Sequence, residues 1–93
     1  MGGHMFKSAD SGFYLEEDPR QPLAEIDFIP LGENELSITH TYVSDALRGQ
    51  GVGGKLVDAV AGLARTQGKK LSATCSFARK LLKENVRYAD IVR

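Results

Sequence analysis

A seven-residue loop, Arg48-Gly49-Gln50-Gly51-Val52-Gly53-Gly54, constrains this chain more than any other segment. It follows a stretch with the alternation of a strand and opens a stretch with the spacing of a helix. Glycine lets main-chain N–H groups approach a ligand, and a helix N-terminus carries partial positive charge. The loop therefore predicts an anion site, with phosphate as the guest. A plain capping turn is the alternative, but such a turn does not require four glycines and an arginine in seven residues.

Before the loop, apolar residues alternate with polar ones, which is the pattern of half-buried strands. We predict strands at Phe13–Leu15, Leu23–Pro30 and Glu35–Val43, separated by turns at 16–20 and 32–34. In the third strand, strict alternation places four side chains on one face: Leu36, Ile38, His40 and Tyr42.

After the loop, apolar residues recur at steps of three and four, which predicts an amphipathic helix that ends near Gly68. A further strand is predicted at Lys69–Cys75, and a strand, helix and strand in this order normally pack as a parallel crossover. A second, shorter helix is predicted around 77–82, while the tail 86–92 fits either a last strand or a helical turn. The expected fold is α+β with a mixed sheet: antiparallel N-terminal strands, then a β-α-β unit and a second short helix.

Length and composition narrow the class of protein further. The 93 residues are enough for one domain, expected over residues 5–93, and the opening Met1-Gly2-Gly3-His4 reads as an expression-tag remnant. Twelve basic residues balance twelve acidic ones, so the sequence has no excess of positive charge that would favour binding to a nucleic acid. The chain has no apolar run of membrane-spanning length, no signal peptide and one cysteine, so a cytoplasmic protein is expected.

The loop residues match two general phosphate-binding patterns, but the residues that follow the loop do not. The dinucleotide fingerprint fits through three glycines: Gly49, Gly51 and Gly54. That fingerprint needs an acidic residue about 20 positions later, where residues 71–73 read Leu-Ser-Ala. The P-loop pattern fits up to Lys55, but Leu56 stands where a hydroxyl should bind magnesium.

A third pattern, Arg48-x-x-Gly51-x-Gly53, resembles the (Q/R)-x-x-G-x-(G/A) acetyl-CoA signature of the GNAT acyltransferase superfamily. In that family the motif lies between the fourth strand and the following helix of a mixed sheet. The segments His40-Thr41-x-Val43-Ser44 and Cys75-Ser76-Phe77-Ala78 resemble a short, single-domain group that lacks the two helices usually found after the first strand. The resemblance extends over roughly residues 13–85.

This resemblance implies acetyl-CoA as the acetyl donor and no metal. It implies that the pyrophosphate is held by the whole loop: Arg48, Gly49, Gln50, Gly51, Val52, Gly53 and Gly54. Gln50 and Val52 would contribute main-chain N–H groups rather than side-chain chemistry. Val43 is the position at which a main-chain N–H would hold the pantetheine arm and polarise the acetyl carbonyl.

Cys75 and His40 are the candidate catalytic residues. In larger relatives, an Asn-x-x-Ala segment is followed four residues later by a tyrosine. That tyrosine protonates the departing CoA thiolate. Here Cys75 takes the Asn place and Leu82 takes the tyrosine place, so that acid cannot be carried over. At the start of a helix Cys75 could be an acid, a base or an acyl acceptor, the alternative being a small buried residue.

His40 could act as a base paired with Cys75 across adjacent strands, the alternative being a hydrogen-bonded histidine in the core. Tyr42 and Tyr88 could replace the missing acid only where the fold brings them near.

Two functions follow from the sequence. The first is an acetyl-CoA-dependent N-acetyltransferase acting on an amine of a small molecule or a protein. The second is a noncatalytic acyl-CoA-binding or regulatory module, which the missing tyrosine favours. Neither a nucleic acid nor a membrane is expected as a partner, and the exposed edge of a small sheet predicts a monomer or a weak homodimer.

Overall fold

The structure is a computed structural model that describes residues 6–18 and 21–93. The expected tag remnant at 1–4, and residues 19–20 of the first expected turn, lie outside the described residues. The described residues form five strands and two α-helices, with short 3-10 helices after β4 and after α2: β1 (Lys7–Ala9), β2 (Gly12–Asp18), β3 (Gln21–Leu31), β4 (Glu35–Val43), η1 (Asp45–Leu47), α1 (Val52–Thr66), β5 (Lys70–Ala73), α2 (Ser76–Glu84) and η2 (Val86–Tyr88).

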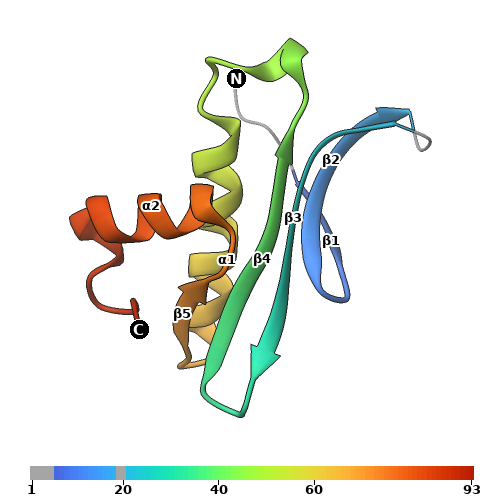
Figure 1. The fold of residues 1–93 in the computed structure, drawn as a ribbon. Helices are drawn as coiled ribbons and strands as arrows, with labels where there is room; N and C mark the ends of the chain where they lie inside the picture. Colours follow the sequence, from blue (N-terminus) through green and yellow to red (C-terminus); the bar gives the residue numbers. More distant parts are fainter. Residues whose placement is uncertain (1–5, 19–20) are drawn as a thin grey trace.

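The strands form one mixed sheet in the order β1-β2-β3-β4-β5 (Figure 1). Neighbouring strands from β1 to β4 pair antiparallel, and β5 pairs parallel with β4 after the chain has passed through α1. The expected α+β fold with a mixed sheet is therefore confirmed. Strand β1 was not predicted, because its three residues are all exposed and carry no alternation. The first turn was predicted too early, since residues 16–18 belong to β2.

Helix α1 covers one face of the sheet and contacts β2, β3, β4 and β5. Alternate residues of β3 point toward it, and Ala24, Ile26 and Phe28 are buried as the pattern predicted. The helix ends as expected before Gly68, whose φ of 69° is a left-handed value that glycine adopts at little cost. Neither described helix combines the length and the apolar character that crossing a membrane requires.

Strand β4 contains a β-bulge that overturns one prediction. Asp27 pairs with His40 and Phe28 pairs with Ile38, so Thr39 is an extra residue without a partner in β3. An extra residue reverses the alternation of everything that follows it in the strand. The expectation that His40 and Tyr42 share a face with Leu36 and Ile38 is therefore wrong.

The last residues are tied to α1 and β5. Arg65 of α1 donates to both carboxylate oxygens of Asp90 and, at 2.6 Å, to the carbonyl of Arg87. The main chain of Leu71 in β5 accepts from Arg93 and donates to the carbonyl of Ile91, and residue 92 forms a parallel bridge with Leu71. The tail that fitted either a strand or a turn thus contains both, a 3-10 turn followed by a single bridge.

Candidate functional site

The predicted loop surrounds a hollow of about 220 Å³ at the N-terminus of α1. Its lining includes every residue predicted to hold the cofactor except Gln50: Val43, Arg48, Gly49, Gly51, Val52, Gly53 and Gly54. Leu47 and Phe77, which were not predicted to hold the cofactor, complete the lining. The structure thus brings the end of β4, the glycine loop and the start of α2 to one place. Phe77 could have been suspected as an apolar side chain in the first turn of a short helix.

The glycine loop places main-chain donors at the N-terminus of α1, beside this hollow. Gly49 and Gly51 have φ values of 84° and 72°, which side-chain-bearing residues adopt only with strain. Gly51 is the N-cap of α1, and the first bond of the helix runs from the Lys55 N–H to the Gly51 carbonyl. The N–H groups of residues 52–54 therefore have no partner within the helix, and no acidic residue lies in the first turn. This is a suitable place for an anion.

Gly53 and Gly54 are glycines for different reasons. A Cβ at Gly53 would lie 2.6 Å from the Phe77 ring, so its absence lets α1 and α2 approach each other. Gly54 has an ordinary φ and no neighbouring atom within 4 Å of where a Cβ would lie. Glycine at such a helical position costs about 0.5–1 kcal/mol relative to alanine. Since no contact within the protein requires glycine there, the open space is available to a ligand.

Arg48 lines the hollow, whereas Gln50 does not. Arg48 Nε lies 3.0 Å from Asp45 Oδ1, and the arginine side chain is 74% exposed. Such an exposed ion pair contributes little to stability, so the guanidinium is free to turn toward an anion. The Gln50 N–H donates to the Leu47 carbonyl at 3.3 Å, contrary to the expectation that this group would be free for a ligand.

Strands β4 and β5 separate at the end of the sheet that lies nearest the glycine loop. Their pairing ends at Ile38 and Ala73, and the N–H groups of Thr74 and Cys75 both point to the Ile38 carbonyl. Residues 39–43 continue beside β3 alone. Because the Ser44 N–H donates to β3, alternation turns the main-chain groups of Val43 away from β3 and toward the opening. An unpaired strand edge of this kind can bind an extended ligand.

Cys75 lies at the far end of this opening, as the N-cap of α2. Its Sγ donates to Thr41 Oγ1 at 3.6 Å. Thr41 is two residues from Val43 and lies on the same face of β4. Partial burial raises the pKa of the Cys75 thiol, but the main chain of Ala78 and the Thr41 hydroxyl favour the thiolate, and the net effect lowers that pKa below its ordinary value.

This lowered pKa predicts how Cys75 reacts with iodoacetamide. We expect the alkylation rate to rise at a lower pH in the folded protein than in the urea-unfolded chain, because the thiolate is the reactive form. The ionised thiol then stabilises the fold above the unfolded-state pKa, and this contribution is lost as the pH falls through the folded-state pKa. Thr41→Val should move the folded-state midpoint upward. A folded-state midpoint at or above the unfolded one would contradict this account.

The structure does not place His40 beside Cys75. After the bulge, His40 lies opposite Asp27 on the sheet face away from α1, whereas Thr41 lies opposite the buried Ile26. The His40 side chain is 55% exposed, and its Nε2 lies 3.9 Å from Glu25 Oε2. The expected pairing with Cys75 and the alternative of a core histidine are therefore both wrong.

Neither tyrosine considered as a substitute acid reaches the opening. Tyr88 is buried, and its hydroxyl donates to Asp58 Oδ1 of α1 at 2.5 Å. Burial, followed by this hydrogen bond, raises the pKa of Tyr88 to about 12. Tyr42 belongs with His40 on the opposite face of the sheet. Leu82, in the place of the usual acid, is buried.

Comparison with solved structures shows that the whole length of this chain is similar to a known protein. A GCN5-like protein of Staphylococcus aureus, whose solution structure was determined by NMR, is 41% identical, with a TM-score of 0.85 over 100% of this chain and 91% of that one. No similar protein was found among curated sequences.

Two more distant structures share the fold. Ard1 from Thermoplasma volcanium is 21% identical over 87% of this chain and 53% of its own, with a TM-score of 0.58. The ribosomal-protein-alanine N-acetyltransferase from Brucella melitensis biovar Abortus is 22% identical over 78% of this chain and 60% of its own, with a TM-score of 0.58.

The family model of GCN5-related N-acetyltransferases matches residues 12–91, which includes β2 to β5, both α-helices and the whole of the hollow. The chain therefore belongs to the GCN5-related N-acetyltransferase family.

Proposed function

We propose that the protein binds acetyl-CoA and transfers its acetyl group to an amine. The observation that carries this proposal is that three features surround one opening between β4 and β5. They are the main-chain N–H groups of residues 52–54, the unpaired edge of β4 at residues 39–43 and the Cys75 thiol with its lowered pKa. The N–H groups of residues 52–54 suit the pyrophosphate. The open edge at Val43 suits the amide-containing pantetheine arm. Cys75 lies where the thioester would follow.

In the proposed reaction the amine nitrogen attacks the carbonyl carbon of the thioester. A C–N bond forms and the C–S bond breaks. The amine nitrogen loses one proton to water, and the departing CoA thiolate gains one. A main-chain N–H on the open edge of β4 would stabilise the negative oxygen that develops during attack. Cys75 would either donate the proton to the thiolate or first accept the acetyl group as a thioester and pass it to the amine.

A noncatalytic acyl-CoA-binding module is the second candidate. The observation that favours it is the loss of the usual acid, since Leu82 is buried and Tyr88 is held by Asp58. Both candidates require the same binding site, so binding is tested first and turnover separately.

Mapping of amide chemical shifts by NMR tests the binding step on the whole chain. We expect acetyl-CoA to shift the amide resonances of Val43, residues 49–54 and Phe77, while those of the β1–β2 hairpin stay in place. ATP with magnesium is the control, because a P-loop protein would respond to it. No shift at millimolar acetyl-CoA would refute the proposal. So would shifts centred on the separate 390 Å³ cavity beside β5 and α2.

A further inference from the structure

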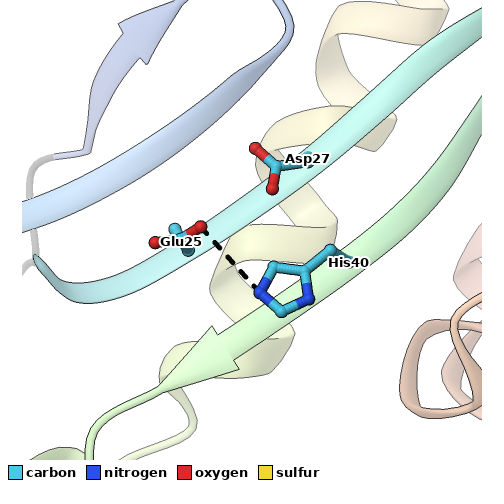
Figure 2. A group of neighbouring side chains, drawn as sticks. All are labelled: Glu25, Asp27 and His40. Atoms are coloured by element: carbon cyan, nitrogen blue, oxygen red, sulfur yellow. Dashed lines mark ion pairs between the residues drawn. The ribbon is translucent and has the colours of Figure 1, made fainter.

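Three side chains with metal-binding atoms gather on the sheet face away from α1. Glu25 and Asp27 are two residues apart in β3 and therefore point to the same face. His40 joins them from β4, where it lies directly opposite Asp27 because the bulge at Thr39 turns it to this side. Figure 2 shows the imidazole between the two strands, with one ring nitrogen facing the Glu25 carboxylate.

The spacing of the three side chains suits a single ion. Each offers one ligand atom, and these atoms all lie within 4.8 Å of one another. Around a bound Zn²⁺ the ligands lie about 2.0–2.2 Å from the metal and hence about 3.3 Å apart. The imidazole is 55% exposed and the Glu25 side chain 32% exposed, so small side-chain rotations can close the remaining distance.

The backbone around the three residues is fixed by the sheet. Gly12 of β2 lies opposite Asp27, and a Cβ at Gly12 would come within 3.0 Å of Asp27 Oδ1 and 2.2 Å of the Ile26 carbonyl. A larger residue at position 12 would therefore occupy the space next to this carboxylate. Ligands carried by two paired strands are held more precisely than ligands on a loop.

We propose that Glu25, Asp27 and His40 form a binding site for a divalent transition-metal ion, with Zn²⁺ as the ion that fits the donor set. Imidazole nitrogen with carboxylate oxygens is a usual set for zinc, whereas Mg²⁺ and Ca²⁺ prefer oxygen ligands alone. Three protein ligands leave a position for water. The site lies on the opposite face of the sheet from Thr41 and Cys75, so it is separate from the proposed acetyl-CoA site.

Calorimetric titration with Zn²⁺ tests the site, and the background must lack the other imidazole and the thiol, which also bind zinc. Cys75 can bind zinc as a thiolate, and His4 lies outside the described residues, so the reference protein carries His4→Ala and Cys75→Ser. We expect it to bind one Zn²⁺ and to show no comparable heat with Mg²⁺. In this background Asp27→Asn and His40→Gln should each weaken Zn²⁺ binding by at least about tenfold, the scale seen for changes around metal sites.

Glu33→Gln is the matched control, because it removes an exposed carboxylate from the turn after β3 without touching the site. It should leave the Zn²⁺ affinity unchanged. The thermal midpoints of all metal-free variants are compared with that of the reference, and Glu25→Gln replaces any variant whose midpoint falls. The proposal is overturned if the reference protein binds no Zn²⁺ at millimolar metal. It is also overturned if folded Asp27→Asn, His40→Gln or Glu25→Gln protein binds Zn²⁺ as tightly as the reference.

Discussion

Cys75→Ala is expected to lower the rate of acetyl transfer by about 10²- to 10⁴-fold, the usual contribution of a general acid or base, while acetyl-CoA still binds. The alanine removes the thiol beside Thr41 but leaves the main-chain N–H groups of residues 52–54 unchanged. Turnover is measured as free thiol released from acetyl-CoA in the presence of three acceptors: a small alkylamine, a peptide with a free N-terminus and a lysine-containing peptide. Binding is measured by titrating wild-type and Cys75→Ala protein with acetyl-CoA.

Ser76→Ala is the control for this experiment, because Ser76 is the exposed neighbour of Cys75 and also lies at the start of α2. It should retain the wild-type rate. Intact mass after incubation with acetyl-CoA separates the two routes, since an acetyl group on Cys75 that hydroxylamine removes identifies the acyl acceptor. Equal rates for Cys75→Ala and wild type would contradict a role in transfer. Binding without turnover on any amine would instead favour the noncatalytic module.

The second large effect is expected from Gly54→Glu, which should abolish stabilisation by acetyl-CoA. At about 100 times the dissociation constant a ligand adds about 2.7 kcal/mol to the free energy of unfolding. For a domain of this size that corresponds to a rise of roughly 10–20 °C in the thermal midpoint. A glutamate in the first turn of α1 would place its carboxylate at the donors that a phosphate needs, so the variant should show no rise.

The ligand-free stability of Gly54→Glu should not fall, because position 54 has an ordinary φ and open space around it. Gly62→Glu is the matched control, since Gly62 lies on the exposed side of the same helix and also has no neighbour within 4 Å of a Cβ. It should keep the full rise. Gly51 is a poorer position for this test, because any side chain there would add backbone strain at φ 72°. A full rise in Gly54→Glu would place acetyl-CoA elsewhere.

Most of the fold could be predicted because its signals are local. The alternation in β3 and the three-and-four spacing in α1 each reflect burial of one face, and the structure has these residues in the core. The glycine loop was recognisable for the same reason, since its positive φ values lie within a few neighbouring residues. The parallel crossover to β5 followed from the order of the elements.

The faces of β4 could not be predicted because alternation assumes an uninterrupted ladder. Thr39 has the same side chain as Thr41, and nothing in the residue type marks the former as the extra residue of a bulge. The bulge became visible only through pairing with Phe28 and Asp27 of β3. This single shift moved His40 away from Cys75 and toward two carboxylates.

Contacts between distant segments were also missed. The hydrogen bond from Cys75 to Thr41 joins residues 34 positions apart, and no periodicity reports such a pair. Phe77 of α2 reaches the hollow because Gly53 of α1 lacks a side chain. This packing depends on two helices that are separate in the sequence. The single bridge to β5 near the end of the chain depends in the same way on a distant contact, in which Arg65 of α1 binds Asp90 of the tail.

The short bridge between Leu71 and residue 92 also bears on how copies of this chain meet. It occupies main-chain groups on the outer side of β5, while at the opposite border of the described sheet β1 offers only three residues. A long unpaired border is what invites a second molecule to extend a sheet. With one border short and β5 capped at Leu71, growth of the sheet from chain to chain is left with the open edge of β4 at residues 39–43. That edge is the one that the proposed function assigns to the ligand.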